Sequence, residues 1–263
     1  MVKRIGRAAA SVLLLLLLLT ATTGSAVPTE DGQRVWRVCV TDAILPPFLY
    51  NDPNRLGIME RIVMAASHEV GLNTVILRYP TQRCRQMMDN GTADSQIFSP
   101  TPMNFAAYQF PMKGGAVDSS RRLAQVHLVW VKRAGTPYEW TANGFTGGKP
   151  EDTLVGTRAG LRVAIEPLTK LGFKVDSTAA NTLQTLRKLD RSRVDIALVQ
   201  QEELAVTMDD ERQNELIILP RIFAPIDYYT AIRKNPSPEN QEQIEAWWNA
   251  IGRLRDLPEF KPY

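Results

Sequence analysis

The chain has 263 residues, of which 44% are hydrophobic and 22% are charged, with 31 Lys and Arg against 28 Asp and Glu. The segment 1–26 contains three basic residues (Lys3, Arg4 and Arg7) and no acidic one, so the remainder, from Val27 to Tyr263, carries 28 charges of each sign. A neutral chain lacks the broad positive field that non-specific binding to nucleic acid or to an anionic membrane requires, and this excludes nucleic acid as a partner.

The segment 1–26 has the pattern of a secretory signal peptide. A basic start is followed by the apolar run "SVLLLLLLLTA" and by the small residues Gly24, Ser25 and Ala26. The run is shorter than the ~20 apolar residues that a membrane-spanning helix needs. We expect cleavage near Ala26 and a soluble periplasmic product.

The first half of the remaining chain predicts two helices between three strands. The alternating, β-branched run "VWRVCVTDAI" predicts a strand. The next helix should end at Gly71, and a second should be capped by Thr81 and end near Gly91. The expected strands are residues 35–44, 73–79 and 93–99, and the expected helices are residues 57–71 and 81–88. This strand-helix-strand-helix-strand order predicts parallel pairing with right-handed crossovers.

The same order returns in the second half. Strands are expected at residues 152–158, 173–177 and 193–200, with helices at 164–172 and 181–189. In each half an Asp, Asp94 or Asp195, opens the last apolar strand. Two similar α/β lobes fit this repetition better than one sheet. The charges of "QQEEL" after the last strand are interpreted as a solvated helix.

Two extended runs and a last helix complete the pattern. Val126–Val131 and residues 224–235 predict strands that cross between the lobes. The last helix should be capped by Ser237, with Pro238 at its first position. Its apolar face consists of Ile244, Trp247, Trp248, Ile251 and Leu254. At this spacing, core packing is favoured over a sugar-binding platform for the two tryptophans.

The chain contains two cysteines, Cys39 and Cys84. Exported chains meet oxidising conditions, and the spacing fits neither Cys-x-x-Cys nor a zinc cluster. One structural disulfide is therefore favoured over a redox pair or half of a metal site. His68 and His127 have no companion ligands in a metal-binding pattern, so we expect neither a metal nor a cofactor.

The order of these motifs resembles the bacterial extracellular solute-binding proteins of family 3, over about residues 34–260. The resemblance rests on "RVCVTDAILPPFLY", "GIMERI", "YPTQRCRQMMDNGTAD", "SPTPMNF" followed by "YQFPM", and "RVDIALVQ". It implies an α/β, type II periplasmic-binding-protein fold with two lobes and two hinge crossings. The first lobe would comprise residues 34–128 and 226–263, and the second lobe would comprise residues 129–225. A branch of the family with similarly placed cysteines supports a Cys39–Cys84 bridge.

The resemblance also implies where a ligand would bind. The loop after the third strand, residues 99–105, would form one wall of a cleft beyond the carboxyl ends of the strands. The residues expected to bind ligand are, on the first wall, Asp42, Phe48, Tyr79, Arg83, Ser99, Thr101 and Asn104; on the second, Thr157, Arg158, Ala159, Gly160 and Gln200; and Tyr228 near the hinge.

Two departures from the family bear on the ligand. Amino-acid-binding members carry an Arg where this chain has Asn104, and an Asp where it has Gln200. Both ionic anchors of an amino acid are thus neutral amides here, which argues against ordinary polar amino acids. Arg158, in "GTRAG" before a helix, would face an anionic group, unless it is simply a surface arginine. The expected ligand is neutral or singly anionic, with a weakly polar body.

The function implied is capture of a small molecule, without catalysis, by a monomer that serves an inner-membrane ABC permease or a sensor partner. Two alternatives use the same fold. One is an orphan sensor or accessory protein that no longer binds tightly. The other is a dehydratase-like enzyme, which needs a buried carboxylate or histidine at the cleft.

Overall fold

The computed structural model describes residues 34–208, 215–234 and 241–262. The expected signal peptide lies outside these residues, as do Ser237 and Pro238, which were expected to begin the last helix. Within the described ranges, no helix combines the length and apolar character needed to cross a membrane.

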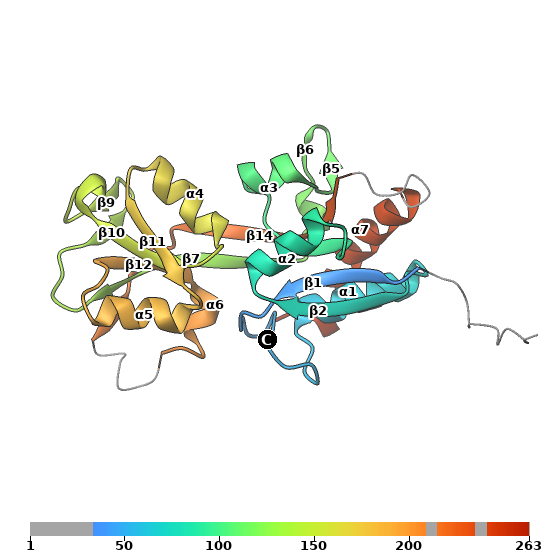
Figure 1. The fold of residues 1–263 in the computed structure, drawn as a ribbon, viewed down its shortest axis with the longest axis horizontal. Coiled ribbons are helices and arrows are strands. Elements are labelled where there is room, and N and C mark those ends of the chain that lie inside the picture. Colours follow the sequence, from blue (N-terminus) through green and yellow to red (C-terminus); the bar gives the residue numbers. More distant parts are fainter. Residues whose placement is uncertain (1–33, 209–214, 235–240, 263) are drawn as a thin grey trace, which may run out of the picture. The chain divides into compact units, whose positions relative to one another are not determined.

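The first half folds in the predicted order (Figure 1). Its elements are β1 (Trp36–Thr41), α1 (Ile58–Glu69), β2 (Thr74–Tyr79), α2 (Thr81–Asp89) and β3 (Ser95–Phe98). β1 lies between β2 and β3 and is parallel to both, as the strand-helix-strand pattern predicts. Gly71 and Gly91 follow the two helices with φ of 69° and 76°, in the left-handed region that glycine enters at little cost.

The predicted cap of α2 is wrong by one position. Pro80 occupies the N-cap and Thr81 is the first helical residue. The Thr81 hydroxyl donates instead to Thr41 Oγ1, 3.1 Å away at the end of β1.

The second half repeats the arrangement. Its elements are β10 (Leu154–Arg158), α4 (Arg162–Lys170), β11 (Lys174–Ala179), α5 (Thr182–Asp190) and β12 (Ile196–Gln200). β10 is parallel to both β11 and β12. Asn181 caps α5, because its side chain accepts a hydrogen bond from the backbone N–H of Gln184 at 2.9 Å.

Two ten-residue strands, β7 (Ala124–Arg133) and β14 (Ala224–Arg233), connect the halves. They are antiparallel neighbours, which Figure 1 shows side by side. Further along, β7 pairs with β12 and β14 pairs with β3. Strand pairing is therefore continuous in the order β11-β10-β12-β7-β14-β3-β1-β2. The limits of the two lobes at residues 128/129 and 225/226 stay a prediction.

Shorter elements surround this frame. Among the described residues they are α3 (Pro102–Ala107), β4 (Tyr108–Gln109), β5 (Met112–Lys113), β6 (Ala116–Val117), β8 (Glu139–Thr141), β9 (Gly144–Thr146), α6 (Gln201–Leu204), β13 (Leu216–Ile218) and the 3₁₀ turns Ser119–Arg121, Pro150–Asp152 and Pro258–Phe260. α3, which follows β3, begins with Thr101 as its N-cap and Pro102 at its first position. α6, which follows β12, carries the "QQEEL" charges.

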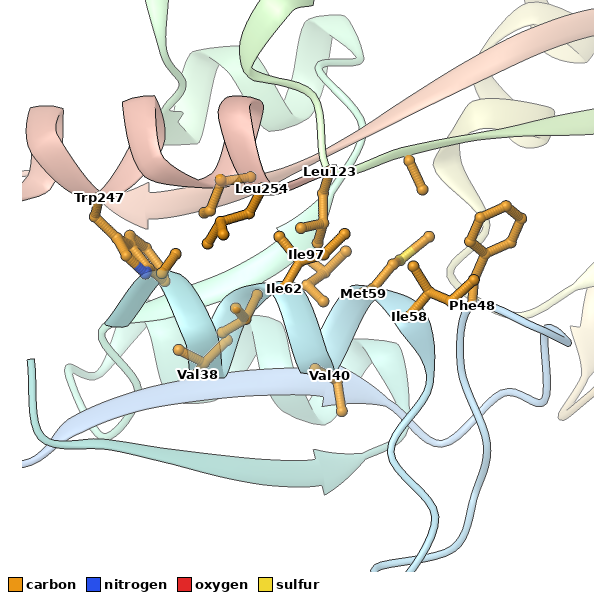
Figure 2. Close-up of a cluster of buried hydrophobic side chains, with 14 of the residues drawn as sticks. Val38, Val40, Phe48, Ile58, Met59, Ile62, Ile97, Leu123, Trp247 and Leu254 are labelled. Carbon is orange, nitrogen blue, oxygen red and sulfur yellow. The ribbon is translucent and has the colours of Figure 1, made fainter. Parts of the chain in front are cut away.

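The largest core lies around α1 and the last helix, α7 (Gln241–Arg255). Figure 2 shows side chains of α1 pointing toward Leu123 and toward Trp247 and Leu254 of α7. Trp247 and Trp248 are 0% and 2% exposed, and the indole N–H of Trp247 donates to Ser67 Oγ at 3.0 Å. Both tryptophans are core residues, as their spacing predicted. A separate core packs against Trp130 of β7 on the side of α4.

The predicted disulfide is present. It joins Cys39 of β1 to Cys84 of α2, with Cα atoms 5.6 Å apart and both residues fully buried. The bond fastens α2 to the centre of its sheet.

The β11–α5 contact predicts how stability responds to acid. Lys188 Nζ lies 2.8 and 2.7 Å from the Asp176 carboxylate oxygens. Burial acts most strongly on the pKa of Asp176 and raises it, but hydrogen bonds from Lys188 and Thr178 together outweigh burial and lower the pKa to about 2. Because this value is below the ordinary 3.8, the stabilisation is present above about pH 4 and is lost as pH falls through about 2.

We therefore expect Asp176→Asn to be less stable than wild type near pH 6, with a difference that shrinks between pH 4 and pH 2. Urea unfolding of both proteins at a series of pH values measures this difference in stability. Asp190→Asn, which alters an exposed carboxylate at the end of α5, serves as the control. A difference that stays constant down to pH 2 would contradict the assignment.

Candidate functional site

Polar side chains gather where β1, β3, β10 and β12 reach their carboxyl ends. Asp42 follows β1, Ser99 follows β3, Arg158 ends β10, and Gln200 ends β12. In α/β folds, ligands bind beyond these strand ends. Three cavities lie in this region, and each is lined by residues of both halves.

The central cavity is the smallest, at about 30 Å³, which is room for about one water molecule. Its lining consists of Thr41, Thr81, Arg85, Ile97, Phe98, Ser99, Asn104, Arg158, Gly160, Leu161, Arg162, Val163 and Tyr228. Three of these residues are arginines and none is acidic.

A larger cavity adjoins on each side. One of about 540 Å³ shares Ser99 and Val163 with the central cavity, and its further lining is Pro100, Thr101, Pro102, Glu166, Pro167, Lys170, Pro225, Ile226, Asp227 and Tyr229. The other, of about 450 Å³, shares Thr81 and Arg158, and its further lining is Asp42, Ala43, Ile44, Asn51, Pro80, Gln82, Ala159, Ala180, Asn181, Thr182, Leu183, Glu203, Val206 and Thr207.

Arg158 belongs to a buried polar network. Its Nε donates to Glu203 Oε1 at 3.0 Å, and one terminal nitrogen donates to Gln200 Oε1 at 2.9 Å. The Gln200 amide in turn donates to the Tyr228 hydroxyl at 2.9 Å. The Arg158 and Glu203 side chains are only 6% and 4% exposed. The interpretation of Arg158 as a surface arginine is therefore wrong, and a carboxylate of the protein already compensates its charge.

Glu203 also corrects the interpretation of "QQEEL" as a solvated helix. The residue is 3% exposed and accepts a second hydrogen bond from the Thr182 hydroxyl. Burial raises the pKa of Glu203, and the charge and hydrogen bond of Arg158 oppose that rise. The carboxylate is an internal partner of Arg158 at the cavity wall.

Several hydrogen bonds connect α2 and α3 of the first half with the segment around α4 of the second. Arg162 donates to Asn104 Oδ1 at 2.8 Å, and Arg85 donates to the Gly160 carbonyl at 2.9 Å. The Thr101 hydroxyl donates to Glu166 Oε1 at 2.6 Å. Asn104 is thus held in place, since its amide nitrogen also donates to the Ser99 carbonyl at 2.9 Å.

Arg85 lies in a strongly positive environment. Its pKa is lowered to about 10, first by burial and next by the positive charge of Arg162. Arg158 lowers the pKa further, while Tyr108 and Glu166 act in the opposite direction. Guanidinium groups of both halves therefore repel one another around the central cavity.

Eight of the thirteen predicted site residues line the three cavities: Asp42, Ser99, Thr101, Asn104, Arg158, Ala159, Gly160 and Tyr228. Gln200 lines none of the three cavities, but its side chain accepts a hydrogen bond from Arg158. The four others line none of the three cavities. Phe48 packs in the core beside Ile58 (Figure 2), Thr157 is fully buried, and Tyr79 and Arg83 are exposed. Ligand contact by any of these residues stays a prediction.

Sequence reasoning missed five residues that define the site, namely Thr81, Arg85, Arg162, Glu166 and Glu203. Arg85 follows the bridged Cys84 directly, and Arg162 begins α4 two residues after "GTRAG". Both arginines therefore lie in or next to motifs from which the site was predicted. Over the described ranges, no group of three or more His, Cys, Asp and Glu side chains is placed to hold a metal ion.

Solved structures with a similar fold include binding proteins and sensor domains. A histidine kinase sensor domain with similarity to periplasmic binding proteins matches with a TM-score of 0.66 and 16% identity, over 87% of this chain and 93% of that one. Holo ArgBP from T. maritima matches with a TM-score of 0.62 and 16% identity, over 86% and 92%. The GluR0 ligand-binding core from Nostoc punctiforme, in complex with L-glutamate, matches with a TM-score of 0.60 and 16% identity, over 84% and 97%.

No protein-family model matches the sequence, and no curated protein matches it either. At such low identities the structural matches establish the fold. It is the two-lobed α/β fold of type II periplasmic binding proteins, which confirms the fold class that the sequence resemblance implied.

Proposed function

We propose that this protein is a periplasmic solute-binding protein that holds a small molecule at the central cavity and the two larger cavities beside it. One observation carries the proposal: side chains from both halves meet at the carboxyl ends of the strands, around a cavity lined by three arginines. Such convergent polar groups in a cleft are typical of ligand sites in this class of fold.

Ligand binding would shift an equilibrium between open and closed lobes, and a membrane partner would recognise the closed form. The central cavity is too small for more than a water molecule, so Arg162 and Asn104 must separate before a solute enters. An inner-membrane ABC permease is the proposed partner. A sensor protein is the alternative, favoured by the similarity to a histidine kinase sensor domain.

Export to the periplasm is part of the proposal. The signal-peptide pattern of residues 1–26 and the disulfide between Cys39 and Cys84 support it, because structural disulfides persist in oxidising compartments. We propose that the protein acts there as a monomer.

An enzyme on the same fold is the competing proposal, because Glu203 is a buried carboxylate at a cavity wall. Both of its oxygens are engaged, one by Arg158 and the other by Thr182. A general acid or base must reach the proton that it transfers. These contacts favour a supporting role for Glu203 and a binding function without catalysis.

A thermal-shift screen of purified residues 27–263 against a broad metabolite panel tests the binding function. We expect at least one compound to raise the melting temperature and to be recovered unchanged by mass spectrometry. Chemical turnover of that compound would favour the enzyme. A flat response across the whole panel would favour an accessory protein that no longer binds tightly.

Ordinary polar amino acids should bind poorly. Asn104 and Gln200 replace the ionic anchors of amino-acid-binding relatives, and both amides are already hydrogen-bonded to arginines of the protein. We expect calorimetry with glutamate, arginine or histidine to show no strong binding. A submicromolar dissociation constant for any of the three would contradict this prediction.

A further inference from the structure

Two of the three arginines at the central cavity have no acidic partner in direct contact. Arg162 donates to the neutral Asn104 amide, and Arg85 donates to the neutral Gly160 carbonyl. Within the described part of the chain, no carboxylate forms a hydrogen bond or ion pair with either one. Arg158 differs, because Glu203 compensates it. Two guanidinium groups without a direct carboxylate contact, one from α2 and one from α4, thus line the same small space.

Two residues that line the same space carry unpaired polar atoms. Ser99 and Arg85 are 6% and 9% exposed, and both line the central cavity. The Ser99 hydroxyl and the Arg85 Nε are buried without a hydrogen-bond partner. Leaving such donors unpaired is costly, whereas an anion accepts from several donors at once.

The surrounding charges agree with an anion at this position. The positive charge of Arg162 helps to lower the pKa of Arg85, and a negative group between them would turn this repulsion into attraction. The first turn of α4, where Arg162 lies, adds the positive end of a nine-residue helix. Glu166, the carboxylate whose charge acts on Arg85, is bound by the Thr101 hydroxyl and lies on the wall of the adjoining cavity.

That adjoining cavity has a different character. It begins at Ser99 and Val163, which it shares with the central cavity, and much of its remaining wall is apolar, with Pro100, Pro225 and Ile226 among the lining residues. Its volume of about 540 Å³ is within the range of small-molecule pockets. A ligand with its charge at the arginines therefore has an apolar space for its body.

We infer that the ligand is a small organic acid whose anionic group, carboxylate or phosphoryl, lies between Arg85 and Arg162 and accepts a hydrogen bond from Ser99, with an apolar body in the 540 Å³ cavity. This inference rests on the proposed solute-binding function and specifies its ligand. On binding, the anion replaces Asn104 Oδ1 and the Gly160 carbonyl as the acceptor for the two arginines.

The test is calorimetry on residues 27–263 with matched probes. Benzoate, phenylacetate and hexanoate represent carboxylates, phenyl phosphate represents phosphoryl groups, and benzamide, phenylacetamide and hexanamide are the neutral counterparts. We expect at least one acid to bind and its neutral counterpart to bind at least ten-fold more weakly. Comparison of the carboxylate and phosphate arms identifies the anionic group.

Variants locate the contact. Arg85→Gln and Arg162→Gln should each weaken binding of that acid by about ten-fold or more, because each removes a charge-assisted hydrogen bond. Arg162→Lys, which keeps the charge, should lose less. Arg187→Gln, at an exposed arginine of α5, is the matched control and should bind as wild type does. Melting curves confirm that each variant is folded.

The outcomes separate the two levels of the proposal. Neutral compounds that bind as tightly as acids, or acids that bind Arg85→Gln and Arg162→Gln undiminished, would overturn the anion site and leave the solute-binding function standing. A protein that binds none of the acids would also overturn the anion site. If no compound of the metabolite panel raises the melting temperature either, the solute-binding function is also contradicted.

Discussion

Replacing Glu203 by alanine should destabilise the protein by about 3–5 kcal/mol, the usual cost of leaving one partner of a buried ion pair alone. Arg158 and Glu203 lie 3.0 Å apart with side chains 6% and 4% exposed, so the Arg158 charge loses its carboxylate partner in a largely buried position. The Thr182 hydroxyl loses its acceptor in the same variant. Urea unfolding followed by circular dichroism measures the loss.

A double variant separates charge from packing. Arg158→Met combined with Glu203→Leu removes both charges and keeps most of the side-chain volume, so it should be clearly more stable than Glu203→Ala alone. Glu202→Ala, at the neighbouring carboxylate that contacts His127, is the positional control and should cost less. If the free energy of unfolding of Glu203→Ala lies within about 1 kcal/mol of the wild-type value, the Arg158–Glu203 pair is not buried in solution.

The fold was predictable because its signals are local. Alternating β-branched residues marked β1, and Gly71 marked the end of α1. The strand-helix-strand order then restricts the pairing to parallel neighbours. Trp247 and Trp248 were assigned to the core from helical spacing alone, and both are buried.

The site was less predictable, because its key contacts join residues that are distant in sequence. Glu203 stands among polar neighbours in "QQEEL", where nothing local distinguishes it from a solvated carboxylate. Arg158 lies 45 positions earlier, and only the pairing of β10 with β12 brings the two together. Asn104 and Arg162, which are 58 residues apart, likewise come into contact only in the folded chain.

Two of the predicted site residues could have been questioned from strand and helix geometry. Successive side chains of a strand point to opposite faces, so Thr157 and Arg158 cannot both enter the same cavity, and it is Arg158 that does. On α2 the predicted Arg83 is exposed, whereas Arg85, two residues later, is buried. Residues two apart on a helix do not share a face, and the sequence did not show which face met the cavity.

Removing the disulfide should have an effect of similar size to the loss of Glu203. The bond closes a loop between positions 45 residues apart, for which the chain-entropy estimate gives ~4 kcal/mol at 25 °C. Cys39 and Cys84 are both fully buried in a cluster that includes Met88 and Phe98. The double variant Cys39→Ala, Cys84→Ala avoids placing new polar groups there, and urea unfolding should show a loss of about 3–4 kcal/mol.

The wild-type protein supplies the control for this variant. Because the bond is buried, reductant should act only after unfolding, and wild type unfolded and refolded with dithiothreitol should then match the double variant in stability. Arg85 follows Cys84 directly on α2, so the bond has a second conceivable role, that of fixing a ligand contact. If fixing Arg85 were the main role of the disulfide, the free energy of unfolding of the double variant would lie within about 1 kcal/mol of the wild-type value, while its affinity for an acid would fall sharply. The loop-closure argument requires a different result. The double variant should lose much of its stability while α2 stays docked, and its affinity should fall only in proportion to the unfolded fraction.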